Sequence, residues 1–155
     1  MRAVIQRVSK ADIVINGVQG GKIGRGLVVL LGVSDEDDEK CVDYLAHKVL
    51  GLRIFSDQED KLNLSLEDIK GDILIVSNFT LYGNCKKGNR PSFVKAAKPP
   101  IATELYESFV NKIKENAPSA VYTGEFGADM QINLINDGPI TIIMDTDEIM
   151  PQNKK

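Results

Sequence analysis

The chain has 155 residues, of which 43% are hydrophobic and 26% are charged, and its formal net charge is −3. These values predict one globular domain, residues 1–150, followed by a polar tail, residues 151–155, that frays. The longest apolar run, Leu27 to Gly32, is too short for a membrane span, and nothing near Met1 resembles a secretion signal. We therefore expect a cytoplasmic protein with no membrane partner.

The content of histidine and cysteine excludes several kinds of site. His47 is the single histidine, and Cys41 and Cys85 stand at unrelated spacings, so we expect free thiols, no metal site and no cofactor. His47 falls outside the apolar stripe of its predicted helix, which argues against Ser-His-Asp or Cys-His catalysis. No pair of carboxylates indicates acid/base chemistry. A hydrolase built from this chain would depend on backbone amides, a placed water and a reactive substrate.

Strands are predicted in the first third of the chain. Residues 3–5 and 11–15 are rich in β-branched side chains, and Asn16-Gly17 after them is a strong hairpin signal. The glycines of residues 20–26 lack the ending of a phosphate-binding loop and are typical of a turn. They lead into residues 27–31, an apolar run that predicts a buried central strand.

A first amphipathic helix is predicted after this strand. Residues 34–38 offer N-cap side chains and a first turn rich in acids, and Gly51 marks the end of the helix. Residues 73–76 then form a second apolar run, typical of another buried strand. The apolar face of the helix consists of Val42, Leu45, Ala46, Val49 and Leu50.

A second amphipathic helix is predicted between Pro99-Pro100 and Pro118. After it, residues 131–135 and 141–144 have the composition of strands, and residues 136–139 between them predict a tight turn. The order of elements indicates one mixed α/β (α+β) domain in which a sheet is covered by two helices. The apolar face of the second helix consists of Ala102, Leu105, Tyr106, Phe109, Val110 and Ile113.

Basic residues are concentrated in one part of the chain. From Tyr82 to Thr103 there are five lysines and arginines and no acid. Such a stretch is often only a solvated loop, although it also allows one phosphate-facing side on an acidic protein.

Two short segments have the composition of a functional site. Residues 77–81, Ser-Asn-Phe-Thr-Leu, place hydroxyls around an aromatic ring at the end of a buried strand. Residues 136–141, Asn-Asp-Gly-Pro-Ile-Thr, contain a Gly-Pro bond, where a cis peptide is accessible. Taken singly, the first segment also fits a polar strand end and the second an ordinary turn.

Together these segments resemble the signatures of the D-aminoacyl-tRNA deacylase family, Ser-Gln-Phe-Thr-Leu and Asn-X-Gly-Pro-Val-Thr. Residues 1–8, 89–93 and 124–130 also look like the family, so the resemblance covers essentially the whole chain. Asn78 stands where the family has glutamine, and Ile140 where it has valine. The resemblance implies a homodimer with a mostly antiparallel or barrel-like sheet and with active sites at the subunit interface.

The resemblance also implies a chemical role for the Gly-Pro pair. Gly138 and Pro139 would form a cis dipeptide that one subunit inserts into the active site of the other. Its carbonyl oxygens would meet the α-ammonium of the substrate and leave no space for a side chain in the L configuration. This chiral gate would admit many D-aminoacyl-tRNAs, and achiral glycyl-tRNA, whose ester is hydrolysed to free amino acid and tRNA.

Catalytic and binding residues follow from the same resemblance. Thr80 would lie beside the ester, and two mechanisms stay open: its hydroxyl is the nucleophile, or the backbone amides of Phe79 and Thr80 hold the carbonyl while a ribose hydroxyl assists water. The second is favoured because no base is evident near Thr80. Ser77 and Phe79 would shape the pocket of the terminal adenosine, and their presence is typical of the D-specific members. The other expected residues are Asn78, Phe126 and Met130 in the substrate pocket, and Arg7, Lys86, Lys87 and Arg90 at acceptor-stem phosphates.

Three other functions remain open at this point. The chain could be an ester or amide hydrolase of the same fold with a substrate other than tRNA. It could be a non-catalytic tRNA-binding dimer, which would bind charged and uncharged tRNA equally. It could also be a structural dimerisation module, in which the Gly-Pro bond would be trans and freely replaceable.

Overall fold

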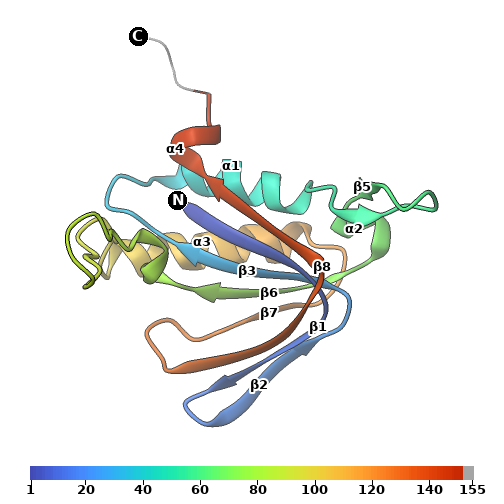
Figure 1. Ribbon diagram of the computed structural model, residues 1–155, viewed down its shortest axis with the longest axis horizontal. Helices are drawn as coiled ribbons and strands as arrows, with labels where there is room; N and C mark the ends of the chain where they lie inside the picture. The colour runs from blue at the N-terminus through green and yellow to red at the C-terminus, as the bar shows by residue number, and fades with distance from the viewer. Residues whose placement is uncertain (152–155) are drawn as a thin grey trace.

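A six-stranded sheet curls into a nearly closed barrel, and two long helices, α1 and α3, cover one side of it (Figure 1). The computed structural model describes residues 1–151. The strand order is β2-β1-β3-β6-β7, with β8 paired to β1, and a separate hairpin joins β4 to β5. The expected mixed α+β fold with a barrel-like sheet is confirmed. The elements are β1 (Arg2–Ile15), β2 (Val18–Ile23), β3 (Gly26–Gly32), α1 (Glu39–Leu50), β4 (Phe55–Ser56), β5 (Leu62–Leu64), α2 (Leu66–Ile69), β6 (Asp72–Ser77), the 3-10 helix η1 (Phe79–Tyr82), α3 (Ile101–Asn116), β7 (Val121–Thr123), β8 (Met130–Asp145) and α4 (Thr146–Ile149).

The first strand organises the barrel. Where two short strands were expected, β1 is one strand of 14 residues. Its first half pairs with β3 and its second half with β2, while β8 runs antiparallel along nearly all of its other edge. Because β1 changes partners halfway, the sheet bends and its two ends approach each other.

The glycine-rich segment is part of a strand, so the expected turn at residues 20–26 is wrong for most of its length. Gly20 and Gly21 belong to β2, which passes close to β7. A Cβ on Gly21 would lie only 2.6 Å from Cδ1 of Tyr122. The glycines are therefore needed for close approach at the seam of the barrel.

The hydrophobic core has two layers, one on each face of β3 and β6. Leu27, Val29, Ile73 and Ile75 pack under the helices in the larger cluster, whereas alternate residues such as Leu74 face the inside of the barrel. Burial on both faces explains why these two strands are continuous apolar runs.

The two long helices are found where their apolar periodicity predicted them. Asp38 caps α1, because its side chain accepts hydrogen bonds from the amides of Lys40 and Cys41, and the helix ends before Gly51. His47 lies exposed on α1, as expected. Helix α3 begins directly after the cis peptide between Pro99 and Pro100 and buries all six residues of its predicted apolar face.

The predicted turn at residues 136–139 is wrong, because β8 continues as one strand of 16 residues on both sides of it. Both halves of β8 pair with β1, so no hairpin forms there. No helix in residues 1–151 is long and apolar enough to cross a membrane. Of the tail that was expected to fray, Pro151 is exposed, and residues 152–155 lie outside the described part of the chain.

Candidate active site

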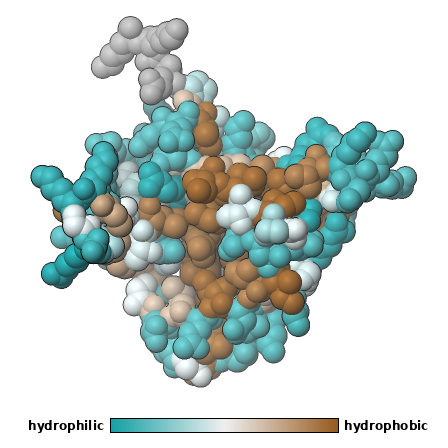
Figure 2. All heavy atoms as spheres, in the orientation of Figure 1, coloured by the Kyte–Doolittle hydropathy of each residue, from teal (hydrophilic) through white to brown (hydrophobic). Residues whose placement is uncertain are grey.

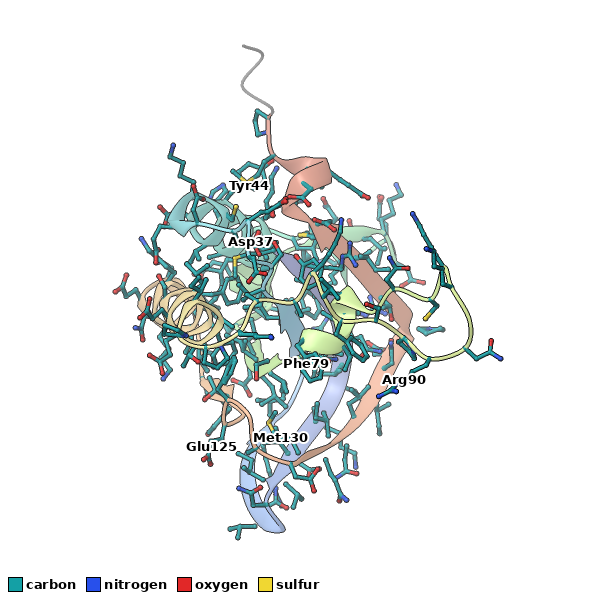
Figure 3. All side chains as sticks on the ribbon, turned by 90° about the vertical axis from the view of Figure 1, so that its left-hand side faces the viewer. Asp37, Tyr44, Phe79, Arg90, Glu125 and Met130 are labelled. Carbon is teal, nitrogen blue, oxygen red and sulfur yellow. The ribbon has the colours of Figure 1, made fainter. Side chains whose placement is uncertain are left out.

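A cavity of about 230 Å³ opens where β6 ends. It lies between the strand exit at residues 77–79, helix α3 and the segment that joins β7 to β8. Figure 3 shows Phe79 above Met130 at this place, with Arg90 on the loop beyond. The cavity is lined by Leu31, Val33, Ser77, Asn78, Phe79, Ala97, Ala102, Tyr106, Phe126, Gly127, Ala128 and Met130.

The strand exit places polar groups and an aromatic ring at the mouth of this cavity. Strand β6 remains paired to β3 up to Ser77, and the amide of Asn78 still donates to the carbonyl of Leu31 at 2.8 Å. The chain then turns sharply into η1. Phe79 is 57% exposed and meets Phe93 edge to face, with ring centroids 5.1 Å apart. Phe79 therefore covers one side of the cavity without being buried itself.

Asn78 caps η1 with its own side chain. Its Oδ1 accepts a hydrogen bond from the backbone amide of Thr80 at 3.2 Å and another from the Thr80 hydroxyl. Among the described residues, the Phe79 amide donates no hydrogen bond. Of the two amides expected to hold a substrate carbonyl, the Phe79 amide is therefore free and the Thr80 amide is occupied.

Aromatic side chains form the inner wall of the cavity. The Tyr106 hydroxyl donates to the carbonyl of Ile75 at 3.2 Å, and burial raises the pKa of Tyr106 to about 12. Its ring lies 5.9 Å from that of Phe126, centroid to centroid. Met130 packs directly against Gly124, where a Cβ would lie 2.4 Å from its sulfur in this conformation. Sequence reasoning missed Tyr106, whose place on the apolar face of α3 indicated only a core residue.

The Gly-Pro segment bulges out of the long β1–β8 ladder. Gln6 pairs with Thr141 and Val8 with Asn136, so residues 137–140 stand opposite Arg7 alone. Within this bulge the Gly138-Pro139 bond is cis, and Gly138 has φ of +133°, a value that L side chains rarely adopt. Gly138 and Pro139 are both exposed.

The side chains of Asn136 and Arg7 form hydrogen bonds to the bulge. The Asn136 side chain accepts from the amide of Ile140 at 2.9 Å and donates to the hydroxyl of Thr141 at 2.8 Å. Arg7 donates from Nε to the carbonyl of Asp137 at 3.0 Å and from Nη1 to the carbonyl of Ile54 at 3.0 Å. Arg7 is buried in these contacts and supports the bulge, and its contact with tRNA phosphates stays a prediction.

The basic stretch forms an exposed loop beside the cavity. Asn84 and Ser92 close it with a pair of backbone hydrogen bonds of 2.8 and 2.9 Å. Lys86, Lys87 and Arg90 lie between them and are exposed. A wider cavity of about 660 Å³ adjoins the loop, and its lining mixes cations such as Lys86 with acids such as Asp35.

The structure thus brings five of the expected site residues together: Ser77, Asn78, Phe79, Phe126 and Met130 all line the smaller cavity. Thr80 lies at its edge, exposed and bound to Asn78. Neither Gly138 nor Pro139 lines this cavity in its own chain. No three His, Cys, Asp or Glu side chains in residues 1–151 are grouped to hold a metal ion, and both cysteines are free thiols.

Comparison with known proteins finds similarity over nearly the whole chain. The family model described as D-Tyr-tRNA(Tyr) deacylase matches residues 4–145. D-aminoacyl-tRNA deacylases of Thermosipho melanesiensis and Fusobacterium nucleatum are each 55% identical to the chain, over 96% and 94% of it and over 99% and 96% of their own lengths.

Two solved structures share the fold. One, described as c-Myc DNA Unwinding Element Binding Protein, is 41% identical, with a TM-score of 0.87 over 94% of this chain and 98% of its own. The other, described as a probable eukaryotic D-amino acid tRNA deacylase, is 23% identical, with a TM-score of 0.76 over 92% and 97%, and shows the fold alone. The match of the family model and the identity to these relatives show that the chain belongs to the D-aminoacyl-tRNA deacylase family.

Proposed function

We propose that this protein hydrolyses the ester of D-aminoacyl-tRNA and of glycyl-tRNA. The observation that carries the proposal is the cavity at the end of β6, where Phe79, whose amide is free, meets an apolar wall, and Thr80 follows at the edge. The relatives that share nearly the whole chain are named D-aminoacyl-tRNA deacylases. An apolar cavity with few polar groups is suited to the end of an aminoacylated adenosine.

The chemistry is an ester hydrolysis without an acid/base pair of side chains. Water adds to the ester carbonyl carbon, and the carbon–oxygen bond to the ribose breaks. One proton of the water passes to the ribose oxygen, which is released as a hydroxyl, and the other passes to the solvent as the amino acid leaves with its carboxylate ionised. The Phe79 amide stabilises the negative charge that develops on the carbonyl oxygen. A ribose hydroxyl beside the ester assists the attacking water.

A second copy of the chain supplies the chiral gate. The Gly138-Pro139 bulge projects from β8, is exposed, and is absent from the lining of the cavity in its own chain. Figure 2 shows apolar surface across the middle of the face over β8, where Ile143 is 69% exposed and Ile135 49%. Such a surface suits an interface between two copies, which would carry the bulge of each to the cavity of the other.

The bulge selects by excluding volume. Its backbone carbonyls bind the α-ammonium of the substrate, and no space remains on the side where an L side chain would lie. A gate made of backbone cannot read the identity of the side chain, so D-amino acids of many kinds are accepted. Glycine has no side chain to exclude and is accepted as well.

The exposed loop that carries Lys86, Lys87 and Arg90 binds the acceptor stem. It lies next to the cavity and has no acid between Asn84 and Ser92 to offset its charge. Phosphate contacts of this kind fix the position of the tRNA without reading its sequence. They allow one protein to act on tRNAs of different sequence.

The activity is tested by incubating the purified protein with D-tyrosyl-tRNA, L-tyrosyl-tRNA and glycyl-tRNA in parallel and measuring the release of amino acid. We expect rapid release from the D and glycyl substrates and none above background from the L substrate. Release from D and L at equal rates would contradict the gate. Release from none of the three substrates would contradict the proposed hydrolase activity.

The source of the gate is tested by mixing two inactive variants. Ala128→Phe fills the cavity and leaves the bulge intact, whereas Pro139→Gly alters the bulge and leaves the cavity intact. After the subunits exchange, half of the dimers are mixed and each has one intact site, so about a quarter of the wild-type activity returns. No recovery, in a mixture shown to contain mixed dimers, would place the gate and the cavity in the same subunit.

A nucleic-acid-binding protein without catalysis is the second candidate. It is favoured by the exposed basic loop and by the 41% identical relative, which is named as a DNA-binding protein. Such a protein would bind charged and uncharged tRNA with equal affinity and release no amino acid from either. The parallel release assay therefore separates the two candidates.

A further inference from the structure

We infer that Asn78 is a positioning residue that acts through its side-chain oxygen, and that it makes the Thr80 hydroxyl a hydrogen-bond acceptor toward the reacting groups. The inference rests on the proposed ester hydrolysis and concerns the separate roles of Asn78, Phe79 and Thr80 in that site. It departs from a role in which the Asn78 amide group itself donates to the substrate.

The geometry ties Asn78 to its own turn. Its backbone is extended, with φ of −146° and ψ of 91°, and its Oδ1 accepts from both the amide and the hydroxyl of Thr80. Asparagine is suited to this place because its short side chain reaches the amide two residues ahead. A side chain longer by one methylene reaches past that amide. The cap therefore depends on asparagine, or on aspartate, which has the same length and the same acceptor.

The contact with Asn78 decides what Thr80 offers to a ligand. A threonine hydroxyl has one proton and two lone pairs. Since its proton is donated to Asn78 Oδ1, the exposed side of the oxygen presents lone pairs only. Thr80 therefore cannot donate to the carbonyl oxygen of the ester. It can accept from an O–H donor, which in this reaction is the attacking water or the ribose hydroxyl.

The backbone supports the same division. The Thr80 amide is bound to Asn78, so the Phe79 amide is the free donor at the strand exit within the described residues. The ester carbonyl oxygen is then held by the Phe79 amide. The attacking water or the ribose hydroxyl is held by the Thr80 hydroxyl. The two groups belong to neighbouring residues of η1 and have different roles. The Phe79 amide stabilises the developing negative charge, and the Thr80 hydroxyl orients a hydrogen-bond donor.

Four variants test the roles by kinetics on D-tyrosyl-tRNA. Asn78→Asp keeps the acceptor and loses the amide donor, so we expect it to retain more of the wild-type kcat than Asn78→Ala, with some loss because its negative charge lies near the developing oxyanion. Asn78→Ala removes the acceptor, and Thr80→Val removes the hydroxyl at equal shape; each lowers kcat by about tenfold with little change in KM. The double variant Asn78→Ala/Thr80→Val is no slower than either single variant, because both changes remove one shared interaction.

Two results would overturn the inference. One is an Asn78→Asp variant as slow as Asn78→Ala, which would show that the amide of Asn78 donates to the substrate. The other is a double variant whose loss is the product of the single losses, which would show that Asn78 and Thr80 act independently. A substrate ending in 2′-deoxyadenosine then identifies the donor: if it is the ribose hydroxyl, Thr80→Val has no further effect on that substrate, whereas a water donor keeps the full effect.

The cap itself is tested without any turnover. Hydrogen exchange of the Thr80 amide, followed by NMR, should be slowed in wild type and in Asn78→Asp and faster in Asn78→Ala. Equal exchange in all three would overturn the inference even in an active enzyme. Slowed exchange in a protein that releases no amino acid would instead leave the cap standing and contradict the proposed function. The two failures are therefore distinguishable.

Discussion

The guanidinium of Arg7 lies beneath Asp137, with Nε 3.0 Å from its backbone carbonyl oxygen and 3.2 Å from its carboxylate Oδ2. This pair joins the middle of β1 to the one place where β8 leaves the ladder. Its second contact, from Nη1 to the carbonyl of Ile54, reaches the segment before β4. One buried side chain therefore connects the Gly-Pro bulge to the body of the fold.

Removing Arg7 should weaken both the fold and the selectivity. Arg7→Met keeps the length of the side chain and deletes its charge and donors, so the buried carbonyl of Ile54 and the partly buried carbonyl of Asp137 lose their partner. We expect the free energy of unfolding to fall by about 2–4 kcal/mol, measured by urea denaturation. We also expect the ratio of D to L hydrolysis to fall. Arg53→Met, at an exposed arginine, is the control and should change neither quantity strongly.

Gly138→Ala should lower the rate on D-aminoacyl-tRNA by at least about tenfold, because a Cβ there would lie 2.8 Å from Cγ1 of Ile140 and would displace the bulge. The rate is measured by release of D-tyrosine. Gly17→Ala, in the hairpin between β1 and β2, is the control: its φ is also positive, at +79°, and its Cβ meets no atom within 4 Å. A side chain at either position meets an unfavourable backbone conformation, but only Gly138 belongs to the bulge, so only the first variant should lose the rate. A normal rate in folded Gly138→Ala would exclude the gate.

Neutralising the basic loop should weaken tRNA binding and not the chemical step. In a variant with Lys86, Lys87 and Arg90 all changed to Gln, we expect KM to rise with kcat nearly unchanged. The slope of log Kd against log salt concentration should fall by about 2, measured by titration with tRNA at several salt concentrations. The control changes three exposed lysines outside the loop, at positions 40, 48 and 61, to Gln. An equal effect of the control would mean that only net charge matters.

The seam between β2 and β7 should tolerate no side chain at Gly21. Gly21→Ala places a methyl group against the Tyr122 ring, and we expect a loss of about 1–3 kcal/mol in the free energy of unfolding. Gly24→Ala in the adjoining turn meets no atom within 4 Å and should cost little. Thermal unfolding of the two variants side by side measures the difference. Equal melting temperatures would contradict the close packing of the seam.

Alkaline pH should destabilise the protein partly through Tyr106. Burial raises the pKa of Tyr106 to about 12 from the ordinary value of 10.0, so the unfolded chain loses this proton first as the pH rises. The stability that comes from the neutral hydroxyl is therefore full below pH 10 and is lost between pH 10 and pH 12. Tyr106→Phe should show a shallower fall of melting temperature over this interval. Tyr122→Phe, at an exposed tyrosine, should keep the slope of wild type.

The elements with local patterns were predictable, and those formed by distant partners were not. The apolar runs of β3 and β6 and the helical spacing of α1 and α3 identify these four elements from sequence alone. The continuity of β8 could not be seen, because Gly138-Pro139 has the composition of a turn. It is the pairing with β1, over a hundred residues earlier, that keeps the strand intact around the bulge.

In the candidate active site, too, local patterns were predictable and contacts between distant residues were not. Residues 77–81 and 136–141 were identified as two separate segments, and the structure places Phe126 and Met130 with the first of them. The inner wall at Tyr106 depends on how α3 packs on the sheet, which no local pattern encodes. The contact of Arg7 with Asp137 could not be predicted, because the burial of this side chain is a property of the folded chain. The cap at Asn78 was not predicted either, although asparagine side chains commonly bond to the backbone two residues ahead.

The bulge in β8 has a consequence for how the protein would lose activity on heating. Its two flanks are held by the longest strand pairing in the molecule, and its centre rests on a buried arginine. A selective element built this way has no hinge of its own, so loosening it requires opening the central ladder. Heating should therefore abolish activity before it lowers the selectivity for D substrates. A heated preparation would contain fewer active molecules, and each of these would keep its selectivity.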